Sequence, residues 1–193
     1  MKRVISNKNN LQILFEDNHL IAINKRCGDI VQGDKTGDSP LSDIVKSYIK
    51  TKYSKQGNVY LGTPHRLDRP TSGVVIFAKT SKSLVRLNKL FKSGKVQKFY
   101  WAITKQKPGK LQDTLTHWLR KNEKNNKSTH FKKETEKAKK AVLHYKIIKE
   151  LDRYFLLQIE LETGRHHQIR CQLSAIGCPI KGDLKYGYDR SNN

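Results

Sequence analysis

One loop and the strand behind it organise this chain: His65-Arg66-Leu67-Asp68-Arg69-Pro70-Thr71-Ser72-Gly73, which runs directly into Val74-Val75-Ile76-Phe77-Ala78. The apolar run predicts a buried strand, and Pro70 and Gly73 predict a tight loop before it. Asp68 is the single carboxylate of the loop and stands between two arginines. Charged residues in a loop anchored on a buried strand are typical of functional sites, so Asp68 is the first candidate for chemistry. The alternative is an ordinary ion-pair cluster of Arg66, Asp68 and Arg69 at a strand edge.

Composition narrows the class of protein. A length of 193 residues allows one domain with a substantial core, and we expect a single domain over residues 1–193. The chain has 39 Lys and Arg against 17 Asp and Glu, a formal net charge of +22, which favours nucleic acid as the partner. No apolar run is long enough to span a bilayer and no basic amphipathic helix stands out, so we expect no membrane partner.

The distribution of cysteine and histidine argues against a disulfide framework and against a metal site. The three cysteines are odd in number and irregularly spaced. His166 and His167 are adjacent, but neighbouring side chains on a helix point about 100° apart, and no Cys or acidic ligand stands nearby in sequence. We expect no metal. The first residues are polar where a signal peptide would be apolar, so we expect a cytoplasmic protein.

Residue periodicity predicts many strands and few helices. Alternating or continuous apolar residues predict strands at 11–15, 20–24, 74–78, 96–104, 111–119, 141–148 and 154–162. Helical spacing predicts a helix that Ser39 and Pro40 open, a second that Thr80 caps, and a third over 166–175. The pattern favours an α+β fold.

Residues 120–140 are rich in Lys and have little apolar surface to bury, which predicts a basic insertion or long hairpin loop. Its positive charge suggests contacts with RNA phosphates. A basic loop that serves only solubility is the alternative. The lysines of the first predicted helix pose the same choice, and there a solvated helix face is favoured.

The loop around Asp68 resembles the catalytic motif of the RluA-type pseudouridine synthases, His-Arg-Leu-Asp followed by Arg and Thr-Ser-Gly. Lys98-Phe99-Tyr100-Trp101-Ala102 is similar to the family's Lys-x-Tyr-x-Ala strand. A third segment, Thr163-Gly164-Arg165-His166-His167-Gln168-Ile169-Arg170, resembles its Thr-Gly-Arg-x-His-Gln-Ile-Arg motif. Because three motifs match in the right order across roughly residues 12–188, the resemblance is specific.

This resemblance implies an isomerase that converts uridine in rRNA or tRNA to pseudouridine without cofactor or metal. It also implies a catalytic domain with a central, mainly antiparallel mixed sheet, flanked by helices and crossed by a cleft. Asp68 would be the catalytic residue, kept ionised by nearby guanidinium groups. Whether it attacks the ribose or the base, or removes a proton, is left open. Substrate-binding positions implied by the family are Arg66, Tyr100, Arg170, Leu173 and His65.

Three of these positions have specific implied roles. The target uridine must leave the helical stack, and Tyr100 would stack on the flipped base. Arg66 would fill the gap left by that nucleotide, and Leu173 would pack beneath the base. For Tyr100 the alternative is a core aromatic beside Phe99 and Trp101.

Two other functions compete with the enzyme: a non-catalytic RNA-binding or ribosome-associated module, and a metal-dependent nuclease. The combination of Asp68, Tyr100 and Arg170 favours the enzyme. The family match begins near Leu11, so we expect no S4-type RNA-binding domain before it, and we expect a monomer. Relatives usually continue past Tyr186-Gly187 with another strand, so either a sheet edge is exposed here or the natural chain extends past Asn193.

Overall fold

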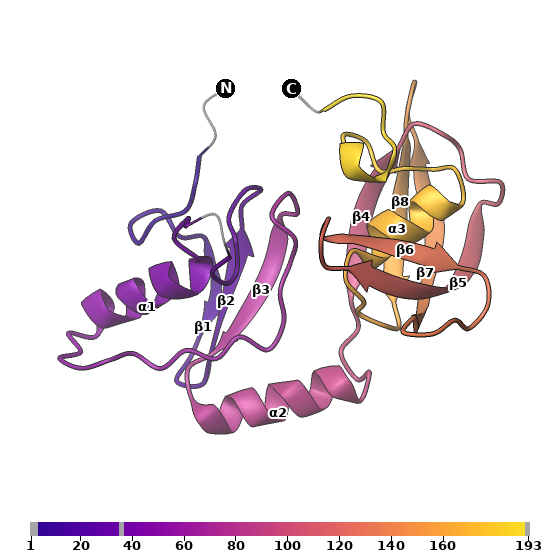
Figure 1. Ribbon diagram of the computed structural model, residues 1–193. Coiled ribbons are helices and arrows are strands. Elements are labelled where there is room, and N and C mark those ends of the chain that lie inside the picture. The colour runs from indigo at the N-terminus through magenta and orange to yellow at the C-terminus, as the bar shows by residue number, and fades with distance from the viewer. Residues whose placement is uncertain (1–3, 35–36, 192–193) are drawn as a thin grey trace. The chain divides into compact units, whose positions relative to one another are not determined.

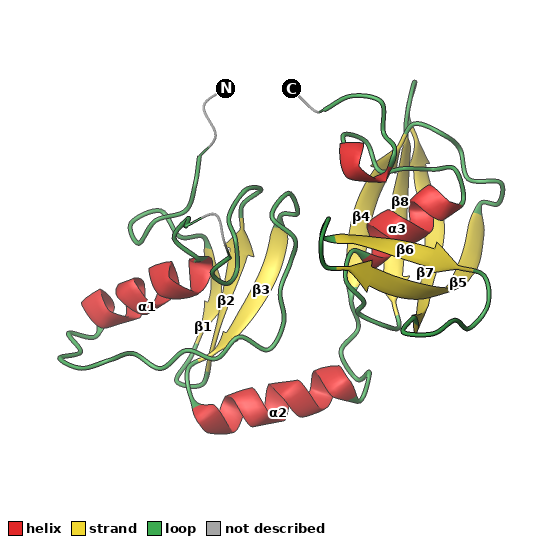
Figure 2. Cartoon of the chain, in the orientation of Figure 1, coloured by secondary structure: helices red, strands yellow, loops and turns green. Residues whose placement is uncertain are grey.

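The computed structural model describes residues 4–34 and 37–191, and the chain divides into two compact units, Met1–Lys95 and Val96–Asn193. Each unit contains its own antiparallel sheet (Figures 1 and 2). The α+β class with antiparallel sheets is therefore confirmed. Within the units the strands form a three-stranded sheet in the first and a five-stranded sheet in the second. A single domain over 1–193 stays a prediction.

The first unit is built on the sheet β1-β2-β3, formed by β1 (Ile13–Glu16), β2 (Leu20–Lys25) and β3 (Gly73–Ala78). Asp17 turns the β1–β2 hairpin, since its carboxylate accepts from the backbone N–H groups of His19 and Leu20 at 2.7 and 2.6 Å. Alternate residues of β2 are buried, as the sequence pattern predicts for a half-buried strand. The predicted hairpin is thus confirmed.

The same unit contains two helices: α1 (Leu41–Lys52), between β2 and β3, and α2 (Ser81–Lys92), after β3. Thr80 caps α2 as predicted and forms a reciprocal capping box with Ser83. The predicted cap of α1 is wrong, because Pro40 occupies the N-cap position and no side chain caps the helix. Backbone carbonyls of the preceding loop accept from the first N–H groups instead, as in Leu41 N to Ile30 O at 2.7 Å.

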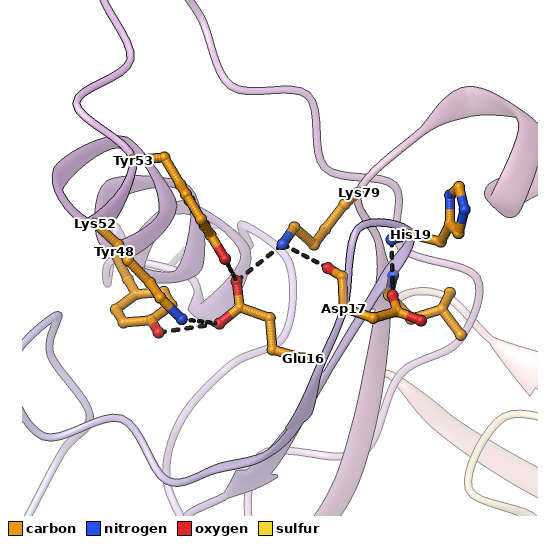
Figure 3. A network of polar contacts seen from close by, with 8 residues as sticks. Glu16, Asp17, His19, Tyr48, Lys52, Tyr53 and Lys79 are labelled. Atoms are coloured by element: carbon orange, nitrogen blue, oxygen red, sulfur yellow. Dashed lines mark hydrogen bonds and ion pairs between the residues drawn. The ribbon is translucent and has the colours of Figure 1, made fainter.

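A buried carboxylate ties the end of β1 to α1 and to the residue after β3. The Glu16 carboxylate accepts hydrogen bonds from Tyr48, Lys52, Tyr53 and Lys79 at 2.7–3.0 Å, as Figure 3 shows. Burial raises the pKa of this carboxyl, but the four hydrogen bonds outweigh burial and lower the pKa to about 2. The network therefore depends on an ionised Glu16.

The second unit holds the sheet β4-β8-β7-β5-β6, in which every pairing is antiparallel. One face packs around buried residues of the strands and of α3, including Leu115, Leu143, Leu157, Ile159 and Leu173. No helix in the described part of the chain is long and apolar enough to cross a membrane. The elements are β4 (Phe99–Thr104), β5 (Gln112–Asn122), β6 (Lys127–Phe131), β7 (Lys139–Glu150), β8 (Phe155–Leu161), α3 (Gln168–Ala175) and the short 3-10 helix η1 (Leu184–Tyr186).

The segment predicted as a loop over 120–140 contains a strand. Here β5 continues to Asn122 and pairs with β6, and only the residues between β6 and β7 form a longer connection. Ser128 fixes β6 although it is not apolar: its N–H donates to the Tyr186 hydroxyl at 2.7 Å and its hydroxyl to the His166 carbonyl at 2.7 Å. These contacts are distant in sequence, so apolar periodicity does not reveal this strand.

We expect Glu16→Gln to lower stability in a pH-dependent way. Because the pKa of Glu16 is depressed from 4.5 to about 2, its contribution is fully present above pH 4.5 and is lost as the pH falls through about 2. At pH 7 the free energy of unfolding of the variant should be lower by about 1–3 kcal/mol, which is less than the full pKa shift corresponds to because solvent screens part of the network. Urea unfolding from pH 7 to pH 2 measures this difference.

The exposed Glu150→Gln is the matched control, and it should show little difference from wild type at any pH, since its ion pair with Lys107 is exposed on both sides. A wild-type minus Glu16→Gln difference that stays constant down to pH 2 would contradict the role of the ionised carboxylate.

Candidate functional site

The segment before the Asp68 loop covers the open edge of β3. Gly62 exchanges two backbone hydrogen bonds with Ala78, at 2.8 and 2.9 Å. Two residues further along this edge, the Ile76 N–H donates to Nε2 of His65 at 3.0 Å. The loop is therefore attached to the strand by both backbone and side-chain bonds, as the apolar run behind it had suggested.

His65 is part of this frame. Its ring stacks on Phe91 of α2 with centroids 4.8 Å apart, and burial lowers the pKa of the imidazole. Neutral imidazole is required here, because Nε2 accepts the hydrogen bond from Ile76. These contacts give His65 a role in positioning the loop; its implied contact with substrate stays a prediction.

The next residues alternate between core and solvent. Leu67 is buried, Asp68 is half-buried and Arg66 is exposed. A turn follows Asp68, with the Thr71 N–H donating to the Asp68 carbonyl at 3.0 Å, and Gly73 at φ +133° opens β3 in a conformation that residues with a Cβ rarely adopt. Asp68 thus sits in a short, fixed turn between a buried leucine and a strand.

A buried lysine braces the other side of this turn. Lys25 ends β2 and is fully buried. Its ammonium group donates to the carbonyls of Thr71 at 2.7 Å, Arg26 at 3.0 Å and Arg69 at 3.2 Å. The sequence analysis did not identify Lys25 as a site residue, although it lies on the same buried face of β2 as Ile21 and Ile23.

The turn that follows Lys25 also holds the Asp68 loop. Gly28 N–H donates to the Arg69 carbonyl at 2.7 Å. Asp29, buried beneath this turn, accepts from the N–H and hydroxyl of Ser6 at 3.1 and 2.6 Å and from the Arg26 N–H at 3.3 Å. A chain of hydrogen bonds therefore runs from the N-terminal segment to the residue after Asp68.

Arg69 finds carboxylates outside the motif. Its guanidinium lies 2.6 Å from Asp38 and 3.4 Å from Asp34. Arg69 thus takes part in ion pairs with carboxylates that the sequence analysis did not name, and the alternative of a cluster with Arg66 and Asp68 stays a prediction. Arg66 forms no hydrogen bond or ion pair with any other residue of the described ranges.

The second unit carries the remaining candidates. Arg170 on α3 forms a bidentate pair with Asp183, with Nε and Nη2 at 2.7 and 2.8 Å from its oxygens, and its guanidinium lies 5.0 Å from the ring centre of Tyr186. Leu173, one turn further, is fully buried in the core. Implied contacts of Arg170 with Asp68, and of Leu173 with a base, stay predictions.

Tyr100 on β4 is half-buried and packs against the core of the second unit. Phe99 and Trp101 are 53% and 75% exposed, so they point to the other face of the strand. The alternative of Tyr100 as a core aromatic therefore agrees with its packing against the core, but Phe99 and Trp101 do not lie there beside it. Tyr100 itself lies at the margin of this core.

The adjacent histidines bond to other side chains. His166 and His167 stack with centroids 3.7 Å apart, and their Nδ1 atoms lie 2.9 Å from the Ser128 hydroxyl and 3.0 Å from the Tyr186 hydroxyl. His167 has φ +52°, so the helix begins only at Gln168 instead of at 166. Residues 4–34 and 37–191 contain no group of three or more His, Cys, Asp or Glu side chains placed to hold a metal ion.

The structure thus places the candidates in two sets. Within the first unit, His65, Arg66 and Asp68 lie in one braced loop. Within the second, Tyr100 and Leu173 belong to one core and Arg170 is fixed beside it. That the two sets form one site stays a prediction.

Comparison with known proteins gives a consistent result. The model of the family described as RNA pseudouridylate synthase matches residues 19–175. The chain is 36% identical over 176 residues to ribosomal large subunit pseudouridine synthase C of Rickettsia prowazekii, covering 91% of this chain and 56% of that protein. To synthase D of Zymomonas mobilis it is 34% identical over 179 residues, again covering 56% of the relative. The chain therefore spans a little more than half the length of these relatives.

Two solved human structures have a similar fold. RNA pseudouridylate synthase domain containing 4 superposes with a TM-score of 0.78 at 27% identity, covering 93% of this chain and 70% of that one. RNA pseudouridylate synthase domain containing 1 superposes with a TM-score of 0.76 at 20% identity, covering 97% of this chain and 74% of that one.

Lys25→Met should destabilise the first unit. The substitution keeps the length of the side chain but removes the donor that three part-buried backbone carbonyls share, so we expect the free energy of unfolding to fall by about 2–4 kcal/mol. Urea unfolding followed by circular dichroism measures this loss. Lys50→Met on the exposed side of α1 is the control and should change stability by less than about 0.5 kcal/mol. Equal effects of the two substitutions would contradict the bracing role.

Proposed function

The chain belongs to the RNA pseudouridylate synthase family, and from this premise we propose that it isomerises specific uridines of RNA to pseudouridine with Asp68 as the catalytic residue. The observation that carries the proposal is the position of Asp68. It lies within the matched region 19–175, in a turn that Lys25 and Gly28 hold at the residues directly after it. Such bracing of a half-buried carboxylate is what a preorganised catalytic group requires.

The reaction breaks the bond between C1′ and N1, turns the uracil within the site, and forms a bond between C1′ and C5. One proton leaves C5 and one is gained at N1, so atoms and charges balance without a cofactor or a metal. An ionised carboxylate can serve as nucleophile or as base.

Base flipping is part of the proposal. Unstacking a nucleotide costs a few kcal/mol, and stacking on an aromatic ring returns about 1–3 kcal/mol per base. Tyr100 is a half-buried aromatic that could take this role, and the exposed guanidinium of Arg66 suits the gap in the RNA. Arg170, fixed by Asp183, would then face the site as a preorientated cation.

For the substrate we propose rRNA, because the relatives in the comparison are named for the large ribosomal subunit. A tRNA uridine is the second candidate. A net charge of +22 supports a large polyanionic partner in either case. We further propose that the protein acts in the cytoplasm, as a monomer.

Asp68→Asn should abolish isomerisation. Because the C5 hydrogen must leave, tritium release from RNA labelled at uracil C5 reports the reaction directly. We expect release by wild type in the presence of EDTA, and a rate lower by roughly 10³-fold or more for Asp68→Asn on rRNA and tRNA fractions. The fraction that responds identifies the substrate.

The exposed Asp152→Asn, in the loop between β7 and β8, is the matched control and should keep wild-type activity. Activity that survives in Asp68→Asn would overturn the assigned catalytic residue. Wild type that binds RNA but releases no tritium would favour the non-catalytic RNA-binding module, and release that EDTA suppresses would contradict the metal-free reaction.

Binding to RNA should depend steeply on salt. Each phosphate contact releases counterions, so the affinity should fall at least roughly tenfold between about 50 and 200 mM salt. Fluorescence anisotropy of labelled rRNA fragments, measured with Asp68→Asn to prevent turnover, gives the slope. A flat response would contradict RNA as the partner of this basic chain.

A further inference from the structure

A pair of aromatic residues lies on the face of the second unit's sheet that turns away from α3. Trp118 of β5 is directly opposite Phe131 of β6 and also opposite Lys140 of β7. Residues directly opposite in an antiparallel sheet share one face, so the three side chains form a row across three strands. Neighbouring Leu119 is buried on the other face, together with Cys171 of α3. Trp118 and Phe131 are both half-buried, so part of each large side chain remains exposed to solvent.

Basic groups surround this row. The guanidinium carbon of Arg120 lies 4.8 Å from the centre of the Phe131 ring, and Arg165 donates from Nε to the Lys140 carbonyl at 2.9 Å. Over residues 118–140 the chain has nine Lys and Arg against three Glu. Two of these three, Glu123 and Glu136, pair with neighbouring lysines of the same segment. We call this row of Trp118, Phe131 and Lys140 the aromatic platform, and the residues around it are predominantly positively charged.

This platform is separate from the proposed catalytic residues of the same unit. Tyr100 is aligned through Ile159 of β8 and Tyr145 of β7 with Asp113 of β5, and therefore shares a face with the odd-numbered residues of β5. Trp118 is even-numbered and faces the opposite side. In the strand order, three steps separate β4 from β5, about 14 Å at the usual strand spacing.

We propose that Trp118, Phe131, Arg120 and Lys140 form a second RNA-binding surface, which holds a single-stranded part of the substrate away from the target uridine. A base stacks on Trp118, and Arg120 and Lys140 contact the backbone phosphates beside it. The inference rests on the proposed function only for the identity of the substrate, since the surface itself requires no catalysis.

The composition of the row favours single-stranded RNA over the other candidate partners. Aromatic side chains next to cationic groups suit the bases and the charged backbone of a single strand. A duplex presents its bases edge-on and would leave the ring of Trp118 unused. An acidic protein would match the charge but would not require an open aromatic face.

The test uses a fluorescein-labelled oligouridylate and the full chain. Trp118→Leu keeps an apolar side chain but removes the stacking ring, and should weaken binding by roughly 5- to 100-fold. Trp118→Phe keeps a ring and should restore most of the affinity. Lys140→Glu should weaken binding and reduce the slope of affinity against salt by about 1 or more. Lys149→Glu, the same charge change on an exposed residue of β7, is the matched control.

A direct signal is available because the chain has two tryptophans, Trp101 and Trp118. In Trp101→Phe the fluorescence of Trp118 is observed alone, and a stacked base should quench it as oligouridylate is added. In the tritium-release assay, Trp118→Leu should raise KM for long RNA and leave kcat unchanged, because the platform acts outside the reacting nucleotide.

Three outcomes would overturn the proposal: wild-type affinity in Trp118→Leu, unchanged Trp118 emission at saturating RNA, or a loss in Trp118→Leu that Trp118→Phe does not restore. The last result would assign Trp118 to packing, and circular dichroism melts show directly whether a variant is folded. Quenching and a weakened Trp118→Leu, in a protein that forms no pseudouridine, would uphold this surface while rejecting the proposed function.

Discussion

The arrangement of the Asp68 loop depends on one buried cation. The Lys25 ammonium donates to three backbone carbonyls, two of which belong to residues just after Asp68. Placing a charge in a core is costly unless its hydrogen-bonding capacity is satisfied, and here the carbonyls of two loops supply the acceptors. The geometry is mutually enforcing, because the loops cannot separate without leaving the ammonium group unsatisfied. These hydrogen bonds fix the conformation of a loop of polar residues as closely as packing fixes a hydrophobic core.

Local patterns in the sequence predict much of this fold. Alternation in β2 and β8 and the apolar run of β3 show which side chains are buried, and the capping box at Thr80 is a contact made within three residues. What the sequence could not show are partners that lie far along the chain. Arg69 reaches Asp38 across 31 residues, and β6 is held through Ser128 by groups 38 and 58 residues away. Folding brings such groups together through the topology, which periodicity does not encode.

The same contrast between local patterns and distant partners applies to the candidate site residues. Asp68, Tyr100 and Arg170 are predictable because each stands in a recognisable motif, whereas the groups that hold them are scattered. Asp183 and Tyr186, which fix the Arg170 guanidinium, lie beyond α3 in a segment with little regular structure. Residues that take part in a reaction are restricted by its chemistry and recur in sequence motifs. The residues that position them depend on packing, and many different side chains can do this.

The covered edge of β3 has a consequence for the protein in concentrated solution. An unpaired strand edge is a template on which another chain can add a strand, and β3 is apolar enough to invite this. Gly62 and the ring of His65 accept hydrogen bonds from two N–H groups on this edge, those of Ala78 and Ile76. The segment that presents the candidate catalytic carboxylate therefore also protects the first unit from self-association, so selection for activity and selection against aggregation act on the same few residues.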